Sequence, residues 1–255
     1  MKQFIILAIL LISCRNISFG QLEFQFQAGV SSFRLNFPGF KTYLDSYNEQ
    51  NNTSSMIKPA KFNPYGIGYH FGGMVRISWF VTGINIGHVS GFESKATYTY
   101  DQSRSFQFKN TYFDLQLGGR IGGKKFAFIP YVNMSINSLH LNTFFTYDKV
   151  KSYGGEKNLN GIYTSWRLIG SAGGRLEYRF TKMIGVFLDM SFTINKSEYL
   201  GGDFAESNSA TDAKYFQSTA TQDQTSAITG GLKEVYRISR GVLGLQLTFG
   251  RNEKE

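Results

Sequence analysis

Two groups of residues carry reactive or charged side chains within stretches that alternate with a period of two positions. The first is the tripeptide His88-Val89-Ser90, in which an imidazole and a hydroxyl would share one face of an extended strand. A base beside a hydroxyl nucleophile is an arrangement used in ester hydrolysis. The second group consists of charged residues in otherwise alternating apolar stretches: Glu23, Arg76, Asp114, Arg167, Arg175, Glu177 and Asp189. The role of each group depends on the strands that carry it.

The stretch from Gly161 to Phe180 shows most clearly what those strands are. Apolar residues such as Trp166 and Leu168 occupy its even positions, and charged residues such as Arg175 and Glu177 occupy odd ones. This period of two predicts a strand with one apolar and one polar face. The alternation lasts much longer than an ordinary strand of about 5–6 residues. Aromatic residues end the apolar face, which is typical of a strand that crosses a bilayer.

Seven further stretches repeat the pattern. They lie at about residues 22–35, 65–79, 84–100, 105–121, 126–137 and 184–194, with the last ending at residue 249. Short turns and long polar loops largely alternate between the eight stretches. This organisation predicts an all-β fold, a single eight-stranded antiparallel up-and-down transmembrane β-barrel over residues 21–250. The aromatic-ended apolar exterior disfavours a soluble barrel that carries a ligand inside.

The start of the chain predicts export. Lys2 is followed by an apolar run from Phe4 to Ile12, which is too short to span a bilayer as a helix and predicts a signal peptide over residues 1–20. A second interpretation stays open, in which a lipobox ends at Cys14 and makes it a lipidated N-terminus. In the first interpretation the only cysteine leaves with the signal, so the mature protein has no disulfide or thiolate metal ligand. Residues 251–255 form a tail.

The interior of such a barrel limits what its charged residues can do. Eight strands enclose a space just wide enough for side chains, so buried charges must pair with one another or with trapped water. Arg175 and Asp189 lie equally far from the turn at Thr181–Lys182, on neighbouring strands, and we expect them to meet. The charged group therefore predicts a structural ion-pair network that fills the lumen, with a path for protons or solutes as the alternative.

The connections carry weaker signals. Residues 35–63 and 201–231 read as long polar loops, which are either solvated surface or the contact site for a protein partner. The alternation slips between Phe108 and Phe113, so we expect a β-bulge there. The net charge of +9 at pH 7 is spread over strand positions and strand ends, without a compact basic cluster, and we expect no nucleic-acid partner.

At this level the chain resembles the small outer-membrane barrels of the OmpA/OmpX-like class. Residues Gly244-Leu245-Gln246-Leu247-Thr248-Phe249 look like the C-terminal insertion signal of that class, although Val242 stands where a polar residue is usual. The Phe-, Tyr- and Asn-rich strands are similar to those of PorT-like barrels of the Bacteroidota. The resemblance implies an outer-membrane location, contact with lipid and lipopolysaccharide, and a non-enzymatic role. That role is surface-structural or binding, or accessory to an envelope assembly such as a secretion system.

The His88-Val89-Ser90 tripeptide also resembles the His-x-Ser pair of lipid A deacylase barrels, which faces the outer leaflet. The resemblance implies an alternative function as an outer-membrane esterase. The sequence departs from that pattern at Gly91, where the family has Asn, and near Gln102, where the family has an orienting Glu. Glu93 and Asp101 are the remaining candidates for a third member. We therefore expect a non-enzyme without a cofactor or metal.

Overall fold

The computed structural model describes residues 22–52, 54–147, 150–152, 161–194, 198–206 and 237–250. The predicted signal peptide, Cys14 and the C-terminal tail lie outside these residues. Eight strands form a closed ring in which each strand pairs antiparallel with the next and β12 returns to β1. These strands are β1 (Leu22–Asn36), β3 (Tyr65–Ile77), β4 (Phe80–Tyr98), β5 (Ser103–Gly119), β7 (Phe126–Tyr147), β9 (Gly161–Arg179), β10 (Ile184–Thr193) and β12 (Arg237–Gly250). The predicted all-β, eight-stranded up-and-down barrel is confirmed.

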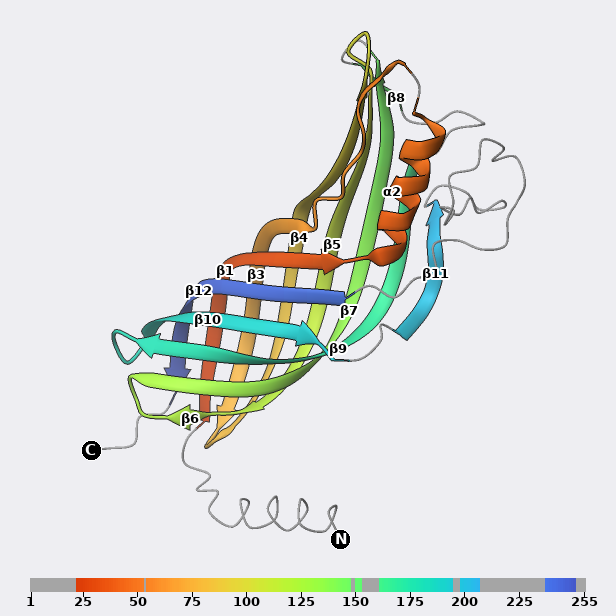
Figure 1. Ribbon diagram of the computed structural model, residues 1–255. Coiled ribbons are helices and arrows are strands. Elements are labelled where there is room, and N and C mark those ends of the chain that lie inside the picture. The colour runs from red at the N-terminus through yellow and green to blue at the C-terminus, as the bar shows by residue number, and fades with distance from the viewer. Residues whose placement is uncertain are drawn as a thin grey trace.

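The wall of the barrel has two heights. Strands β1, β10 and β12 contain 15, 10 and 14 residues, whereas β4 and β9 contain 19 each and β7 contains 22. Figure 1 shows the long strands rising well beyond the ends of the short ones. Four short strands attach to the long strands: β2 (Met56–Lys58), β6 (Ile121–Gly122), β8 (Val150–Ser152) and β11 (Glu198–Glu206). The tower is the name that we use for the part of the molecule that extends beyond the upper ends of the ring strands β1, β10 and β12.

The face that carries the apolar residues differs between the lower barrel and the tower. In the barrel the apolar residues point outward, as shown by Phe26 and Ile67, whose side chains are 59% and 66% exposed. In the tower the apolar residues point inward, and Phe106 and Phe108 of β5 are buried. The neighbouring outward position, Lys109, is exposed. The lower exterior is thus apolar, whereas the tower encloses an apolar core of its own.

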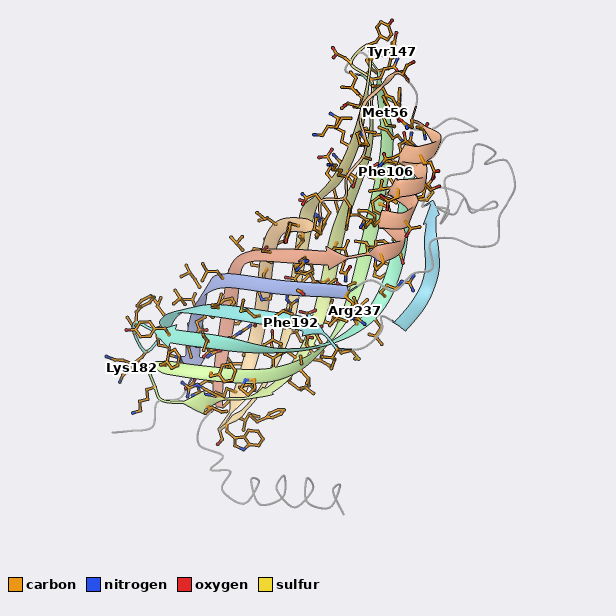
Figure 2. All side chains as sticks on the ribbon, viewed as in Figure 1. Met56, Phe106, Tyr147, Lys182, Phe192 and Arg237 are labelled. Atoms are coloured by element: carbon orange, nitrogen blue, oxygen red, sulfur yellow. The ribbon has the colours of Figure 1, made fainter. Side chains whose placement is uncertain are left out.

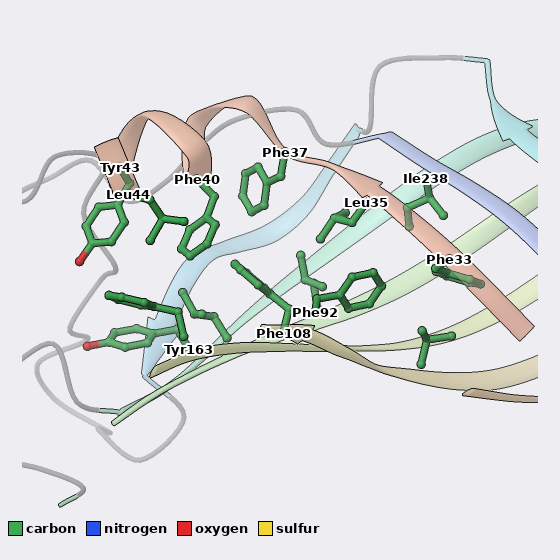
Figure 3. Packing of buried hydrophobic residues seen from close by; sticks show 14 of the residues in the cluster. Phe33, Leu35, Phe37, Phe40, Tyr43, Leu44, Phe92, Phe108, Tyr163 and Ile238 are labelled. Atoms are coloured by element: carbon green, nitrogen blue, oxygen red, sulfur yellow. The ribbon is translucent and has the colours of Figure 1, made fainter. Parts of the chain in front are cut away.

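Helix α2 (Pro38–Gln50) completes that core, so the prediction of a plain polar loop over residues 35–63 is wrong. Phe40, Tyr43 and Leu44 lie on one face of α2 and are buried, as Figure 3 shows. The ring of Phe40 packs edge-on against Phe108 with a centroid distance of 4.6 Å. Burial raises the pKa of Tyr43 well above its usual value, so this residue stays protonated. Within the described residues, no helix is long and apolar enough to cross a membrane.

The irregularity near Phe108 also differs from the sequence prediction. In β5 the inward series runs without a break from Phe106 to Gln116, so the expected bulge between Phe108 and Phe113 is absent from this described strand. The extra residue lies instead in the partner strand β4 at Gly91, between the pairs Ser90–Lys109 and Phe92–Phe108. Gly91 has a φ of 103°, which glycine adopts without the steric cost that other residues meet.

Candidate functional site

The centre of the lumen is built around Arg175 and Asp189. These residues face each other across β9 and β10, and their side chains are 0% and 2% exposed. The guanidinium Nε donates to Asp189 Oδ2 at 3.0 Å, and Nη2 lies 2.9 Å from the same oxygen. Tyr131 donates a second hydrogen bond to Asp189, and Gln27 accepts one from Arg175. Both buried charges are therefore compensated by charge and by hydrogen bonds.

A second pair, Asp114 with Arg240, lies toward the tower. Both side chains are buried, and the guanidinium of Arg240 donates to the carboxylate of Asp114. The guanidinium also lies over the ring of Tyr112, 4.9 Å from its centroid. Arg240 is a residue that the sequence prediction missed. Continuing the alternation backward from Leu243 would have placed Arg240 inward and revealed it.

The opposite end of the lumen holds a cluster of arginines around Glu23. Arg76 and Arg179 both donate to the carboxylate of Glu23, and the contact from Arg179 measures 2.8 Å. Glu177 is buried nearby, and within the described residues neither of its oxygens has a hydrogen-bond partner. Arg76 and Arg120 are its electrostatic partners. The arginines on this layer supply the positive charge that a buried carboxylate requires.

Arg167 is the last of the predicted lumen residues and lies nearer the tower. Its side chain is buried, and Nε donates to Ser165 Oγ at 3.2 Å. The seven predicted lumen residues are thus distributed over several layers of the barrel. A cavity lined in part by Asp114 and Arg240 measures about 20 Å³, which is room for about one water molecule. The lumen at this level is filled by side chains.

His88 and Ser90 both lie on the outer wall of β4, as the phase of this strand predicts. The Nδ1 atom of His88 makes its hydrogen bond to Thr111 Oγ1, at 2.9 Å, on the neighbouring strand β5. Of the candidate third members, Glu93 accepts a hydrogen bond from Gln107. Asp101 lies in the turn at the tip of the β4–β5 hairpin, far along the strands from His88. The structure therefore places the histidine and the serine on the same outer wall, and among the described residues no acid is hydrogen-bonded to the imidazole.

The sequence prediction missed the polar neighbours of His88 on the same outer wall. His140 of β7 lies 2.9 Å from Thr164 Oγ1 and 3.0 Å from Ser138 Oγ, through its two ring nitrogens. Lys109 of β5 stands opposite both Ser90 and His140. A polar band thus crosses β4, β5, β7 and β9 directly above the apolar exterior. Continuing the outward parity of β7 beyond Ile136 is the signal that would have found it.

A cavity of about 560 Å³ lies where the short strands end beside the tower. Its inner side is formed by apolar residues, among them Leu35, Phe37 and Ile238, which Figure 3 shows beneath the start of α2. Its lining also includes Phe192 and Arg237, which lie close together at the ends of β10 and β12 (Figure 2). Within the described residues, no group of three or more His, Cys, Asp or Glu side chains could hold a metal ion.

Comparisons with known proteins return solved structures alone. Neither a protein-family model nor a curated protein sequence matches the chain. The attachment invasion locus protein Ail of Yersinia pestis aligns with a TM-score of 0.43 and 9% identity, covering 89% of this chain and 98% of that one. The outer membrane protease OmpT from Escherichia coli aligns with a TM-score of 0.38 and 12% identity over 92% and 98%. The N-terminal β-barrel domain of Pseudomonas aeruginosa OprF aligns with a TM-score of 0.27 and 11% identity over 88% and 97%.

Proposed function

We propose that the protein is an integral outer-membrane β-barrel with a non-enzymatic role at the cell surface. The observation that carries the proposal is the apolar outer face of the closed ring. Val30, Ile67 and Leu243, on three neighbouring strands, are 60%, 66% and 64% exposed. A soluble monomer rarely exposes a continuous apolar surface of this kind, because water penalises it. A bilayer covers the same surface with hydrocarbon.

The height of the apolar face supports this proposal. On β1 the outward apolar residues run from Leu22 to Val30. Eight steps of roughly 3.4 Å, on a strand tilted by roughly 40°, give a band roughly 21 Å tall, close to the 25 Å typical of outer-membrane barrels. Aromatic side chains border the band at both levels, with Trp79 and Phe126 at the lower edge and Trp166 at the upper edge.

The tower supports the surface role. A helix packed on inward-facing aromatic residues gives the tower a rigid core, and binding surfaces are commonly presented by segments held on such scaffolds. We propose that the tower faces the cell exterior, where it contacts lipopolysaccharide or a protein partner, and that it serves as a surface structure or as an accessory to an envelope assembly. The filled lumen argues against transport of solutes through the barrel.

Fractionation tests the location. The protein should be recovered with the outer membrane, and its folded form should run faster on SDS gels until the sample is boiled, because a closed barrel resists SDS without heat. Recovery in the soluble periplasmic fraction, or a mobility that heating does not change, would contradict the proposal. A periplasmic marker and a known outer-membrane marker in the same gradient serve as controls.

The lipid A deacylase alternative leads to a separate prediction. We expect no deacylation of lipopolysaccharide, because His88 is bonded to Thr111 and no described carboxylate orients it. The measurement is a mass spectrum of lipid A from cells with and without the protein. Loss of one ester-linked acyl chain that requires the protein, and that Ser90→Ala abolishes while the heat-dependent gel shift persists, would establish the esterase instead.

A further inference from the structure

The cavity at the step between the short strands and the tower has the features of a ligand site. Its volume of about 560 Å³ lies within the range of 300–1,000 Å³ that is usual for small-molecule pockets. Leu35, Phe37 and Ile238 give it a buried apolar side. Cationic residues form much of its border: Arg34 from β1, Lys41 from α2 and Arg237 from β12. Among the described residues, no Asp or Glu lines it.

The three cations differ from the arginines of the lumen. Each ion pair found among the described residues joins a lumen arginine to a carboxylate, whereas Arg34, Lys41 and Arg237 form none there. All three are exposed, and Arg34 rests on the ring of Tyr65, 5.9 Å from its centroid. The first turn of α2 also borders the cavity and contains no acid and no side-chain cap. The border of the cavity thus carries three positive charges without an ion-pair partner among the described residues, and an anion placed there would be attracted by all three.

The position of the cavity indicates where that anion comes from. Phe192, Ser239 and Arg34 face outward side by side on β10, β12 and β1. Two rows lower, Leu188, Leu243 and Val30 belong to the apolar exterior. The cavity thus opens directly above the apolar band, at the level of lipid head groups. Phe192, which is 57% exposed, belongs both to the cavity lining and to the apolar outer wall.

The wall below the cavity offers space for an acyl chain. Gly241 and Ser32 are paired, outward-facing residues that separate the cavity row from the apolar row of Leu243. A Cβ atom added at Gly241 would meet nothing within 4 Å. Gly241 therefore has open space over it, between the apolar row of Leu243 and the row that carries Arg34 and Ser239.

We propose that this cavity binds an anionic amphiphile of the outer leaflet, with its phosphate held by Arg34, Lys41 and Arg237 and its acyl chain lying on Phe192 and Gly241. This inference rests on the proposed membrane location, since only a membrane-embedded barrel presents the cavity to lipid. Free phosphate offers the same charge without the apolar part, so it should bind more weakly. A zwitterionic lipid offers the apolar part without net charge.

The test uses the full chain, refolded in dodecyl maltoside micelles, and measures binding of a fluorescent lysophosphatidic acid. Arg34→Gln combined with Arg237→Gln should weaken binding by at least about tenfold, because two charge-assisted contacts are lost. The matched control, Lys95→Gln combined with Lys109→Gln, removes two exposed cations from the opposite wall and should leave the affinity unchanged. Lysophosphatidylcholine should bind at least about tenfold more weakly than lysophosphatidic acid to the unchanged protein.

Three results would overturn the inference: equal binding of the two lysolipids, equal losses in the two double variants, or competition by inorganic phosphate at concentrations similar to that of the lysolipid. The last result would identify a site for soluble anions. The heat-dependent gel shift is recorded on every sample. A protein that lacks the shift or leaves the outer membrane contradicts the proposed location. A protein that keeps both and shows no preference for the anionic lipid contradicts only the ligand.

Discussion

Replacing Asp189 with alanine should lower the free energy of unfolding of the barrel by about 3–5 kcal/mol, because Arg175 is left charged and unpaired in the lumen. Arg175 is 0% exposed in the intact protein, so bulk water does not solvate the charge that the lost carboxylate leaves uncompensated. The measurement is the fraction of heat-shifted protein on SDS gels after unfolding in urea from lipid vesicles.

Two further variants identify the cause of the loss. Asp45→Ala removes an acid from the exposed face of α2 and should change the stability by less than about 0.5 kcal/mol. Adding Arg175→Met to Asp189→Ala removes the unpaired charge and should recover much of the stability. If Asp189→Ala unfolds at the same urea concentration as Asp45→Ala, the pair contributes nothing. If the double variant is no more stable than Asp189→Ala, the unpaired charge is not the cause.

Phe40→Ala should detach helix α2 while the barrel stays folded. The Phe40 side chain is 0% exposed and lies among the rings of Phe62, Phe106 and Phe108, so its truncation leaves a cavity that costs about 3–5 kcal/mol. That cost corresponds to an increase of about 10²-fold to several thousand-fold in the population of the detached helix. Cleavage by trypsin at Lys41 should accelerate accordingly.

The control for this variant is Thr42→Ala, which changes an exposed side chain of the same helix. Its cleavage rate should stay near that of the unchanged protein. The heat-dependent gel shift should persist in both variants, because the lumen residues do not depend on α2. Simultaneous loss of the gel shift in Phe40→Ala would show that the tower and the barrel unfold as one unit. An unchanged cleavage rate would show that Phe40 does not hold the helix.

The barrel itself could be predicted because residues that alternate along a strand point to opposite faces of the sheet. Once Leu176 and Tyr178 are assigned to the exterior, Arg175 and Glu177 must face the lumen, and the turn at Thr181 fixes their neighbours on β10. The same reasoning places His88 and Ser90 on the outer wall. Arg240 was missed because, for the strand that carries it, the alternation was assigned only as far as its end at residue 249, without a start.

The tower was not predicted from the sequence for a different reason. Phe108 and Phe113 belong to one unbroken strand, but Phe108 contacts α2 inside and Phe113 lies outside. The sequence alone does not show whether an aromatic residue lies in a buried core or on an apolar outer surface. The change from the buried Phe108 to the outward-facing Phe113 therefore looks like a slip in the alternation of the strand. Helix α2 was hidden because its buried residues, Phe40, Tyr43 and Leu44, stand in a polar segment. These residues have helical spacing, but they form a buried face only because aromatic side chains of β5 point inward at the same level. No local sequence pattern reveals that contact.

The exchange of apolar and polar faces along the strands also fixes how deep the protein sits in the membrane that we propose. On β5, sinking by a few residues would carry Thr111 and then Lys109 into hydrocarbon, at a cost approaching about 2–4 kcal/mol for a lysine at the midplane. Rising by the same amount would expose the ring of Phe113 to water, at about 1.5–3 kcal/mol. Similar penalties on neighbouring strands add together, so the free energy rises steeply when the barrel moves along the membrane normal in either direction. A molecule that binds the tower is therefore held at a constant height above the lipid.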